Sequence, residues 1–279
     1  MLSTTRLLAQ GNGPVGQGAR AVALGNASAT LGGDVWAVAN NAAGLGTLTR
    51  PTVGAYLENR YLITSLNATA AVLAMPLGVI EPASAGQPAR ASHGVVGFEA
   101  HRFGGALYNE IRLGAAYGYR LGVVSIGGRL DVLQVSFQDL GSRRAVVGSL
   151  GGQADVVPER LTFGVYLYNL NQAKMAEYQD ERVPTVLRAG LAYKPSKQVT
   201  ILAETEKDIE RNAGVKAGLE YLPIPAVAIR AGYTSLSQQT TGGVGVKAGN
   251  FQFDYAAGWH SVLGLSQFLN VNWQWERKQ

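Results

Sequence analysis

In FQFDYAAGWH (residues 251–260), apolar and polar side chains alternate with a period of two. Phe253 and Tyr255 fall on one face, and Asp254 falls on the other. Successive side chains of a strand point to opposite sides of a sheet, so this alternation predicts a β-strand with one apolar and one polar face. The same pattern in SQFLNVNWQWE (residues 266–276) predicts a second strand soon after it.

The alternation repeats from Pro51 to the end of the chain in stretches of about nine to eleven residues. Counting these stretches predicts about fourteen strands. They are 51–62, 66–76, 91–103, 108–120, 123–137, 143–156, 160–170, 184–194, 198–206, 212–222, 226–234, 242–249, 251–260 and 266–276. The last of these is expected to pair antiparallel with the first, because an open sheet edge in lipid would leave backbone groups unpaired.

The composition favours a membrane over water as the surroundings of these strands. Only 15% of residues are charged, against about 25% in soluble domains. The apolar faces consist of aliphatic residues and often end in Tyr or Trp, as in outer-membrane barrels. The longest apolar run, Ala70–Met75, is far shorter than the roughly 20 residues of a membrane-spanning helix. We therefore predict an all-β transmembrane antiparallel barrel in a bacterial outer membrane. The alternative is a soluble all-β sandwich, whose strands also alternate between apolar and polar residues.

The chain divides into three parts. Residues 1–10 are interpreted as the tail of a signal peptide or as a disordered terminus, because their apolar core is shorter than a signal needs. Residues 11–50 are rich in Gly and Ala, lack the period of two, and are expected to plug the lumen. A short helix is predicted over residues 34–40, with Asp34 as its cap. Residues 51–279 form the predicted barrel.

The connections between predicted strands differ in length. Short links, such as 120–122, 158–159 and 249–250, are expected at the periplasmic end, and longer ones at 171–183, 207–211, 235–241 and 261–265 at the external end. Residues 77–90 break this rule, because a short turn is expected there and the connection is long.

Charged residues on the polar faces of the strands are expected to point into the lumen. They are Arg112, Arg129, Asp131, Arg188, Glu204, Glu206, Lys216, Glu220, Arg230, Lys247 and Asp254. Arg188 is expected beside Glu204, and Lys216 beside Glu204 or Arg230. These charges either neutralise one another and fix the register, or they form a substrate-selective channel.

Catalysis and cofactor binding find little support in the sequence. The chain has no cysteine, and its three histidines lack the spacing of zinc ligands. Gly11, Gly13 and Gly16 match a dinucleotide fingerprint, but no strand precedes them and Pro14 interrupts them. The basic residues are scattered, which argues against nucleic-acid partners. We expect a protein that is not an enzyme and needs no cofactor or metal.

Residues 18–45 (GARAVALGNASATLGGDVWAVANNAAGL) resemble the opening signature of the PorV/PorQ family, which lies within the group of FadL-like outer-membrane barrels. The matching positions are Gly18, Arg20, Gly25, Asp34, Asn41, Gly44 and Leu45; Ala42 stands where the family usually has proline. Residues 260–267 are also similar to the family's last loop and strand.

The resemblance implies a fourteen-stranded barrel with its N-terminal segment inside. It further implies a role in type IX secretion in Bacteroidota, with outer-membrane lipid, translocon components or secreted cargo as partners. FadL-like relatives instead pass hydrophobic small molecules, and this conduit is the alternative function. The outer connections predicted here are modest for a cargo-binding member of the PorV type.

Overall fold

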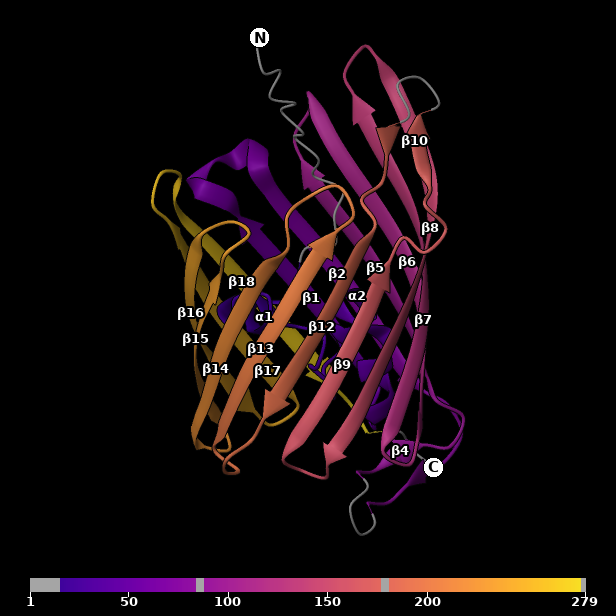
Figure 1. Ribbon diagram of the computed structural model, residues 1–279, viewed down its shortest axis with the longest axis vertical. Helices are drawn as coiled ribbons and strands as arrows, with labels where there is room; N and C mark the ends of the chain where they lie inside the picture. The colour runs from indigo at the N-terminus through magenta and orange to yellow at the C-terminus, as the bar shows by residue number, and fades with distance from the viewer. Residues whose placement is uncertain (1–15, 84–87, 177–180, 277–279) are drawn as a thin grey trace.

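Fourteen antiparallel strands close into a barrel in the computed structural model, which describes residues 16–83, 88–176 and 181–276 (Figure 1). The predicted signal-peptide tail (residues 1–10), Gly11 and Gly13 lie outside the described residues. The barrel strands are β1 (Thr52–Asn59), β2 (Asn67–Pro76), β5 (Val95–Gly104), β6 (Tyr108–Leu121), β7 (Val124–Phe137), β8 (Gly141–Val157), β9 (Leu161–Tyr168), β12 (Val186–Tyr193), β13 (Val199–Asp208), β14 (Gly214–Ile224), β15 (Val227–Thr234), β16 (Gln239–Ala248), β17 (Phe251–His260) and β18 (Gly264–Gln274). The predicted all-β barrel of fourteen strands is confirmed.

The barrel closes where the sequence predicts. Strand β18 pairs antiparallel with β1, in a register that runs from Thr52 opposite Gln274 to Asn59 opposite Gln267. Strand β1 pairs with β2 on its other side. Closure leaves no open sheet edge between the first and last strands, which is the condition for a sheet in lipid.

The two faces of the wall follow the period of two. Leu219, in the middle of β14, points outward with 45% of its surface exposed, whereas its neighbours Gly218 and Glu220 are buried. Val271 is on the outward register of β18, between the buried Asn270 and Asn272. Other large exposed apolar residues form a band around the wall: Phe98, Leu113, Leu130, Val146, Leu150, Leu191, Ile229, Val244, Phe253 and Leu269.

The two ends of the barrel differ. Strand β1 begins and β18 ends at the same end, together with the short turns 158–160, 225–226 and 249–250, so we assign this end to the periplasm. The long connection 77–94 also lies here and contains the two-stranded pair β3 (Ile80–Glu81) and β4 (Arg90–Ala91), which Arg90 and Glu81 link at 2.7 Å. The insertion therefore forms a small hairpin of its own.

At the external end the connections are less uniform than predicted. The connection 169–185 is long and contains the strand pair β10 (Lys174–Ala176) and β11 (Glu181–Arg182). The connection between β1 and β2 contains two 3-10 turns, η2 (Arg60–Leu62) and η3 (Thr64–Leu66). The connection 261–263 has three residues and not the five predicted, because β18 starts two residues earlier, at Gly264.

Residues 16–50 contain the helices α1 (Ala19–Ala23) and α2 (Ala37–Asn40) and the 3-10 helix η1 (Ala42–Thr47). The predicted helix 34–40 is shorter than expected, because residues 34–36 form a turn before α2. Asp34 caps this turn, since its carboxylate accepts a hydrogen bond from the Trp36 amide at 3.0 Å. Among the described residues, no helix has the length and apolar character required to cross a bilayer.

Replacing Leu219 with Arg should destabilise the folded barrel by about 2–4 kcal/mol, because the charge would sit near the middle of the lipid-facing wall. Val271→Arg should cost less, since Val271 lies nearer the periplasmic end of β18. Urea titrations of the protein in lipid vesicles measure the free energy of unfolding. Leu263→Arg is the control, because Leu263 is 52% exposed in an external connection. Equal stability of all three variants would contradict the assignment of faces.

Candidate luminal site

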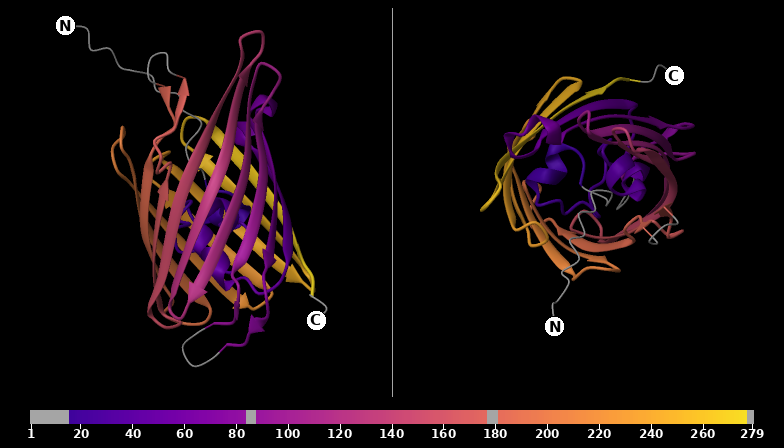
Figure 2. Two further views of the ribbon diagram at one scale, coloured as in Figure 1. Left: turned by 90° about the vertical axis from the view of Figure 1, so that its right-hand side faces the viewer. Right: turned by 90° about the horizontal axis from the view of Figure 1, so that it is seen from above.

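The segment 16–50 lies inside the barrel, as the view from above shows (Figure 2). Helix α1 packs against β15, β16, β17 and β18, whereas α2 and η1 pack against the opposite part of the wall, from β5 to β8. The side chains of this segment are mostly small, which lets its backbone approach the wall closely. The segment therefore spans the lumen from one side to the other.

Polar side chains of the wall bind the backbone of this segment. One carboxylate oxygen of Glu204 accepts hydrogen bonds from the amides of Ser28 and Ala29, at 2.8 and 2.7 Å. The Gln153 amide donates to the carbonyl of Ala29 at 2.9 Å, and Lys216 donates to the carbonyl of Asn26 at 3.2 Å. Irregular backbone away from water needs such partners, because it has no ladder or helix of its own.

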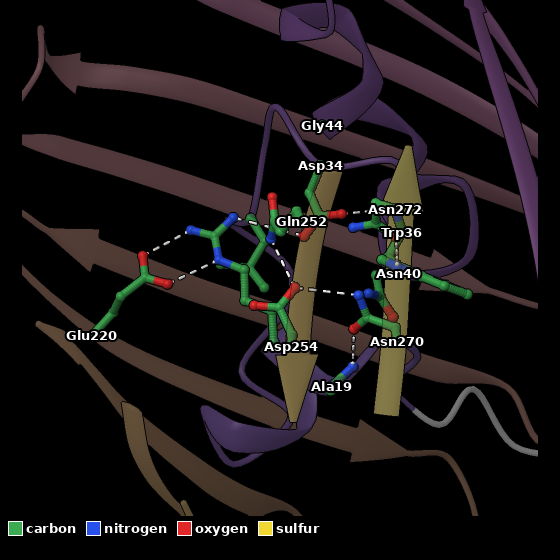
Figure 3. Close-up of polar contacts among 12 residues, drawn as sticks. Ala19, Asp34, Trp36, Asn40, Gly44, Glu220, Gln252, Asp254, Asn270 and Asn272 are labelled. Carbon is green, nitrogen blue, oxygen red and sulfur yellow. Dashed lines mark hydrogen bonds and ion pairs between the residues drawn. The ribbon is translucent and has the colours of Figure 1, made fainter. Parts of the chain in front are cut away.

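Strand β18 binds the same segment with two asparagines (Figure 3). Asn270 accepts a hydrogen bond from the Ala19 amide at 2.7 Å, at the start of α1. Asn272 accepts one from the indole Nε1 of Trp36 at 3.0 Å. Both asparagines lie on the polar face that the alternation in residues 266–276 defines.

An ion-pair network joins the segment to β14, β15 and β17 (Figure 3). Glu220 binds Arg20 of the segment at 2.8 Å and Arg230 at 2.7 Å. Arg230 reaches on to Asp254 at 2.7 Å, and Asp34 lies 3.7 Å from Arg20. Burial raises the pKa of the Asp34 carboxyl above its ordinary value, and Arg20 lowers it in part.

A second network lies between β12, β13 and β14. Arg188 is 2.6 Å from Glu206 and 4.0 Å from Glu204, and Lys216 is 2.8 Å from Glu204 and 2.6 Å from Glu206. Of the two neighbours predicted for Lys216, Glu204 or Arg230, the structure shows Glu204; the register places Thr234 opposite Lys216 and Glu220 opposite Arg230.

A third network lies on β5 and β7. Arg129 forms ion pairs with Asp131 and with Glu99, and it also donates to the carbonyl of Val38 in α2. Sequence reasoning missed Glu99, although it lies on the same face of its strand as His101. It also missed Asn270, Asn272 and the ion pairs of Arg20, whose partners only the closed barrel brings together.

The remaining two predicted charges, Arg112 and Lys247, form no ion pair with these networks among the described residues, although Arg112 lies near enough to Glu99 and Asp131 to be attracted by them. Arg112 is 8% exposed, and its buried Nε atom has no hydrogen-bond partner among the described residues. Lys247 is on the inward register but exposed, at the periplasmic end. It lines a cavity of about 110 Å³ together with Arg20, Asp34, Glu220, Arg230 and Asp254.

The signature positions of the segment lie at its closest contacts with the wall and with itself. Gly18 has a φ of +87°, and a Cβ there would lie 2.6 Å from the Trp36 ring. A Cβ on Gly25 (φ +66°) would lie 2.5 Å from the carbonyl oxygen of Tyr233, and one on Gly44 would lie 2.3 Å from that of Leu31. The Asn41 side chain donates to the carbonyl of Ala29 at 2.7 Å and accepts from the amide of Ala43 at 3.1 Å. Leu45 is fully buried.

The external half of the lumen contains an apolar cluster on the β7–β9 side. Its members are buried and inward-facing: Leu133, Val135, Ala145, Val147, Tyr166, Tyr168, Met175, Val183 and Val186. Met175 and Val183 come from the connection 169–185. Asn169 holds this connection in place, donating to the carbonyl of Val183 at 2.7 Å and accepting from the amide of Ala173 at 2.8 Å.

The wall beside this cluster is not a complete strand ladder. The pairing of β8 with β9 ends at Leu150 opposite Leu167. Beyond it, the amide of Leu170 donates to the carbonyl of Gly148 at 2.8 Å. The Asn171 side chain accepts from the amide of Gly148 and donates to the carbonyl of Val146, both at 2.8 Å. A loop residue and a side-chain amide thus close the wall where a strand would otherwise do so.

Solved structures share this architecture. The CymD monoaromatic hydrocarbon channel aligns with a TM-score of 0.68 at 12% identity, covering 96% of this chain and 99% of that one. The P. putida toluene transporter TodX aligns at 0.63 and 11% identity, covering 95% and 100%. The Acinetobacter baumannii outer membrane protein Omp33 aligns at 0.54 and 8% identity, covering 82% and 100%. With its closed wall and outward apolar band, this chain is a bacterial outer-membrane β-barrel.

No protein-family model matches the chain, and no curated protein sequence matches it. The resemblance of residues 18–45 to the PorV/PorQ family therefore stays a prediction. CymD is named as a channel and TodX as a transporter, but at this identity the likeness shows the fold of this chain alone, and the expectation of a protein that is not an enzyme stays a prediction. Among the described residues, no group of three or more His, Asp or Glu side chains is arranged to hold a metal ion.

Deleting residues 18–45 should raise the conductance of the protein in planar bilayers, because this segment lies inside the lumen and is predicted to plug it. Glu204→Gln should give a smaller rise, since it weakens the hydrogen bonds to the Ser28 and Ala29 amides. Glu210→Gln, at an exposed carboxylate of an external connection, is the control. The mobility of unheated samples in gel electrophoresis verifies folding. Unaltered conductance of the folded deletion variant would mean that the wall side chains alone close the lumen.

Proposed function

We propose that this barrel is a conduit for hydrophobic small molecules. The observation that carries the proposal is the position of the apolar cluster directly inside the incomplete part of the wall. Val147, which is fully buried in the cluster, lies between Val146 and Gly148, the two residues whose backbones Asn171 binds. An apolar molecule in the cluster is therefore separated from lipid by one loop and one side-chain amide.

The polar networks support a lateral route over an axial one. Below the cluster, the segment 16–50 lies across the lumen, and most of the charges around it are paired with one another or with its backbone. An apolar molecule passing through this polar region would separate these groups from their partners without offering them hydrogen bonds, which is unfavourable for buried polar groups. A path from the external end, through the apolar cluster and out between β8 and the connection 169–185 keeps the molecule among apolar side chains. CymD and TodX, the channels with the similar fold, are named for monoaromatic hydrocarbons and toluene.

Locking this part of the wall should stop transport. Cysteines at Gly148 and Asn171 are suitable, because a Cβ at Gly148 would lie 3.7 Å from the Asn171 side chain and the chain has no other cysteine. The oxidised variant should take up radiolabelled toluene more slowly than the reduced variant, in vesicles containing the purified protein.

The control pair is Ala55→Cys with Val271→Cys, which crosslinks two residues that already face each other in the β1–β18 ladder. Oxidising this pair should leave uptake unchanged. Equal uptake by the oxidised and reduced Gly148/Asn171 variant would contradict a lateral route at this place.

Arg112 is proposed to select molecules that carry an oxygen acceptor. It lies beside the cluster, opposite Leu133 in the ladder, with an unpartnered buried Nε. A hydrogen bond to a charged group contributes about 1.5–3 kcal/mol, so Arg112→Met should lower uptake of phenol relative to toluene by about tenfold or more. Arg102→Met, on the outer face of β5, is the control. An unchanged ratio of phenol to toluene uptake in Arg112→Met would exclude this role.

The interpretation as a secretion-associated barrel rests on the resemblance of residues 18–45 and stays a prediction, as do translocon components or secreted cargo as partners. A pull-down from outer membranes would test it. The luminal geometry favours the conduit, because the apolar cluster and the incomplete wall beside it have a direct use in passing apolar molecules.

A further inference from the structure

The outer wall over β5–β8 contains an apolar hollow of about 570 Å³. Its centre is formed by the small outward residues Ala115, Gly128 and Gly148, on three successive strands. Larger apolar side chains surround it: Val96, Phe98, Tyr117, Leu130, Leu150 and Leu170. The hollow lies in the band of the wall that faces lipid.

The backbone does not require glycine at these positions. Gly128 and Gly148 are not among the residues with a positive φ. A Cβ at Gly128 would meet Leu150 at 3.6 Å, and one at Gly148 would meet Asn171 at 3.7 Å, both ordinary contacts. Larger side chains would therefore fit at these positions. The hollow exists because the sequence has glycine and alanine there.

Two exposed arginines lie on the outer face, toward the external end from the hollow. Arg102 follows Phe98 by four residues on β5, and Arg144 precedes Gly148 by four residues on β8, so both lie roughly 13 Å farther along the wall. The ladder puts Arg102, Ile111, Gln134 and Arg144 in one row across four strands, which separates the arginines by about 14 Å. Arg144 donates a hydrogen bond to Gln134 at 2.7 Å, which orients its guanidinium along this row.

We propose that this surface binds a phosphorylated, multiply acylated glycolipid of the outer leaflet. One acyl chain fills the hollow, and two phosphates of the sugar head group bind Arg102 and Arg144. A bilayer lipid supplies the acyl chain that an apolar hollow in this band requires, and guanidinium groups bind phosphate with charge-assisted hydrogen bonds. Two arginines at this separation fit a head group with two phosphates better than a phospholipid, which has one. The hollow borders the proposed lateral route, because Gly148 and Leu170 line it and also close the incomplete part of the wall, but binding of the glycolipid does not require transport.

Native mass spectrometry of the full chain in detergent, with added lipid A or phosphatidylglycerol, tests the proposal. Lipid A should remain bound at concentrations at which phosphatidylglycerol does not. Arg102→Ala and Arg144→Ala should each lower the affinity for lipid A about fivefold. Gly128→Val should lower it as well, by filling the hollow, without affecting the unheated gel mobility that reports folding.

Two matched controls separate this site from general lipid adhesion. Gly242→Val adds the same side chain to the outer face of β16, where a Cβ would meet its nearest atom at 3.6 Å. Lys207→Ala removes an exposed cation from the outer face of β13. Both should bind lipid A like the unmodified protein. Equal losses in the controls, equal binding of the two lipids, or a dimer that Gly128→Val dissociates in the absence of lipid would overturn the proposal.

Discussion

Every backbone amide and carbonyl that is withdrawn from water needs a hydrogen-bond partner, and this requirement organises the whole molecule. In the wall, the requirement is met by fourteen strands whose first and last members pair with each other. In the lumen, the segment 16–50 contains only short helical turns, so much of its backbone has to find partners elsewhere. Wall side chains supply them, from Gln153 and Glu204 on one side to Thr241 and Asn270 on the other.

The binding of the segment 16–50 by side chains of the wall determines what the luminal charges can do. A buried charge without a partner is strongly unfavourable, whereas a buried pair contributes little net stability compared with apolar packing. The networks around Glu220, Glu204 and Arg129 are therefore best understood as fixing the position of the segment and the register of the strands. Because these charges are already paired, they are poorly placed to act as a selective ion path.

The external half of the barrel differs from the charged region around the segment. There the inward residues of β7–β9 are apolar, and the wall beside them lacks a full ladder. Asn171 satisfies the exposed backbone groups of Val146 and Gly148 with its side-chain amide, which carries the same donor and acceptor as a peptide group. A side chain can leave such a position by a rotamer change, whereas a strand would have to lose a series of hydrogen bonds. The incomplete part of the ladder thus lies next to an apolar interior surface.

The sequence by itself determined the strands, their order and their faces, because the period of two is a local property that each segment carries on its own. The alternation around Leu219 and Val271 gives their outward direction, and the alternation around Arg188, Glu204 and Asp254 gives their inward position. Even Glu99 could have been found in this way. The Gly-rich character of residues 11–50 also indicated that this part of the chain differs from the wall.

Only the tertiary structure decided which groups meet across the lumen. Arg20 and Glu220 are separated by 200 residues, other hydrogen-bonded partners of the segment in the wall by 91 to 251 residues, and no local pattern specifies the distance between them. The partners of Lys216, Glu204 and Glu206, depended on the register of β13 and β14, which a shift of two residues would change without altering any face. The incomplete ladder at Gly148 was equally hidden, because β8 is a regular strand in its own sequence. Beyond Leu150, β8 has no strand partner on this side in the described part of the chain, because β9 ends at Tyr168. Hydrogen bonds between segments distant in the sequence fix the position of the residues that follow β9.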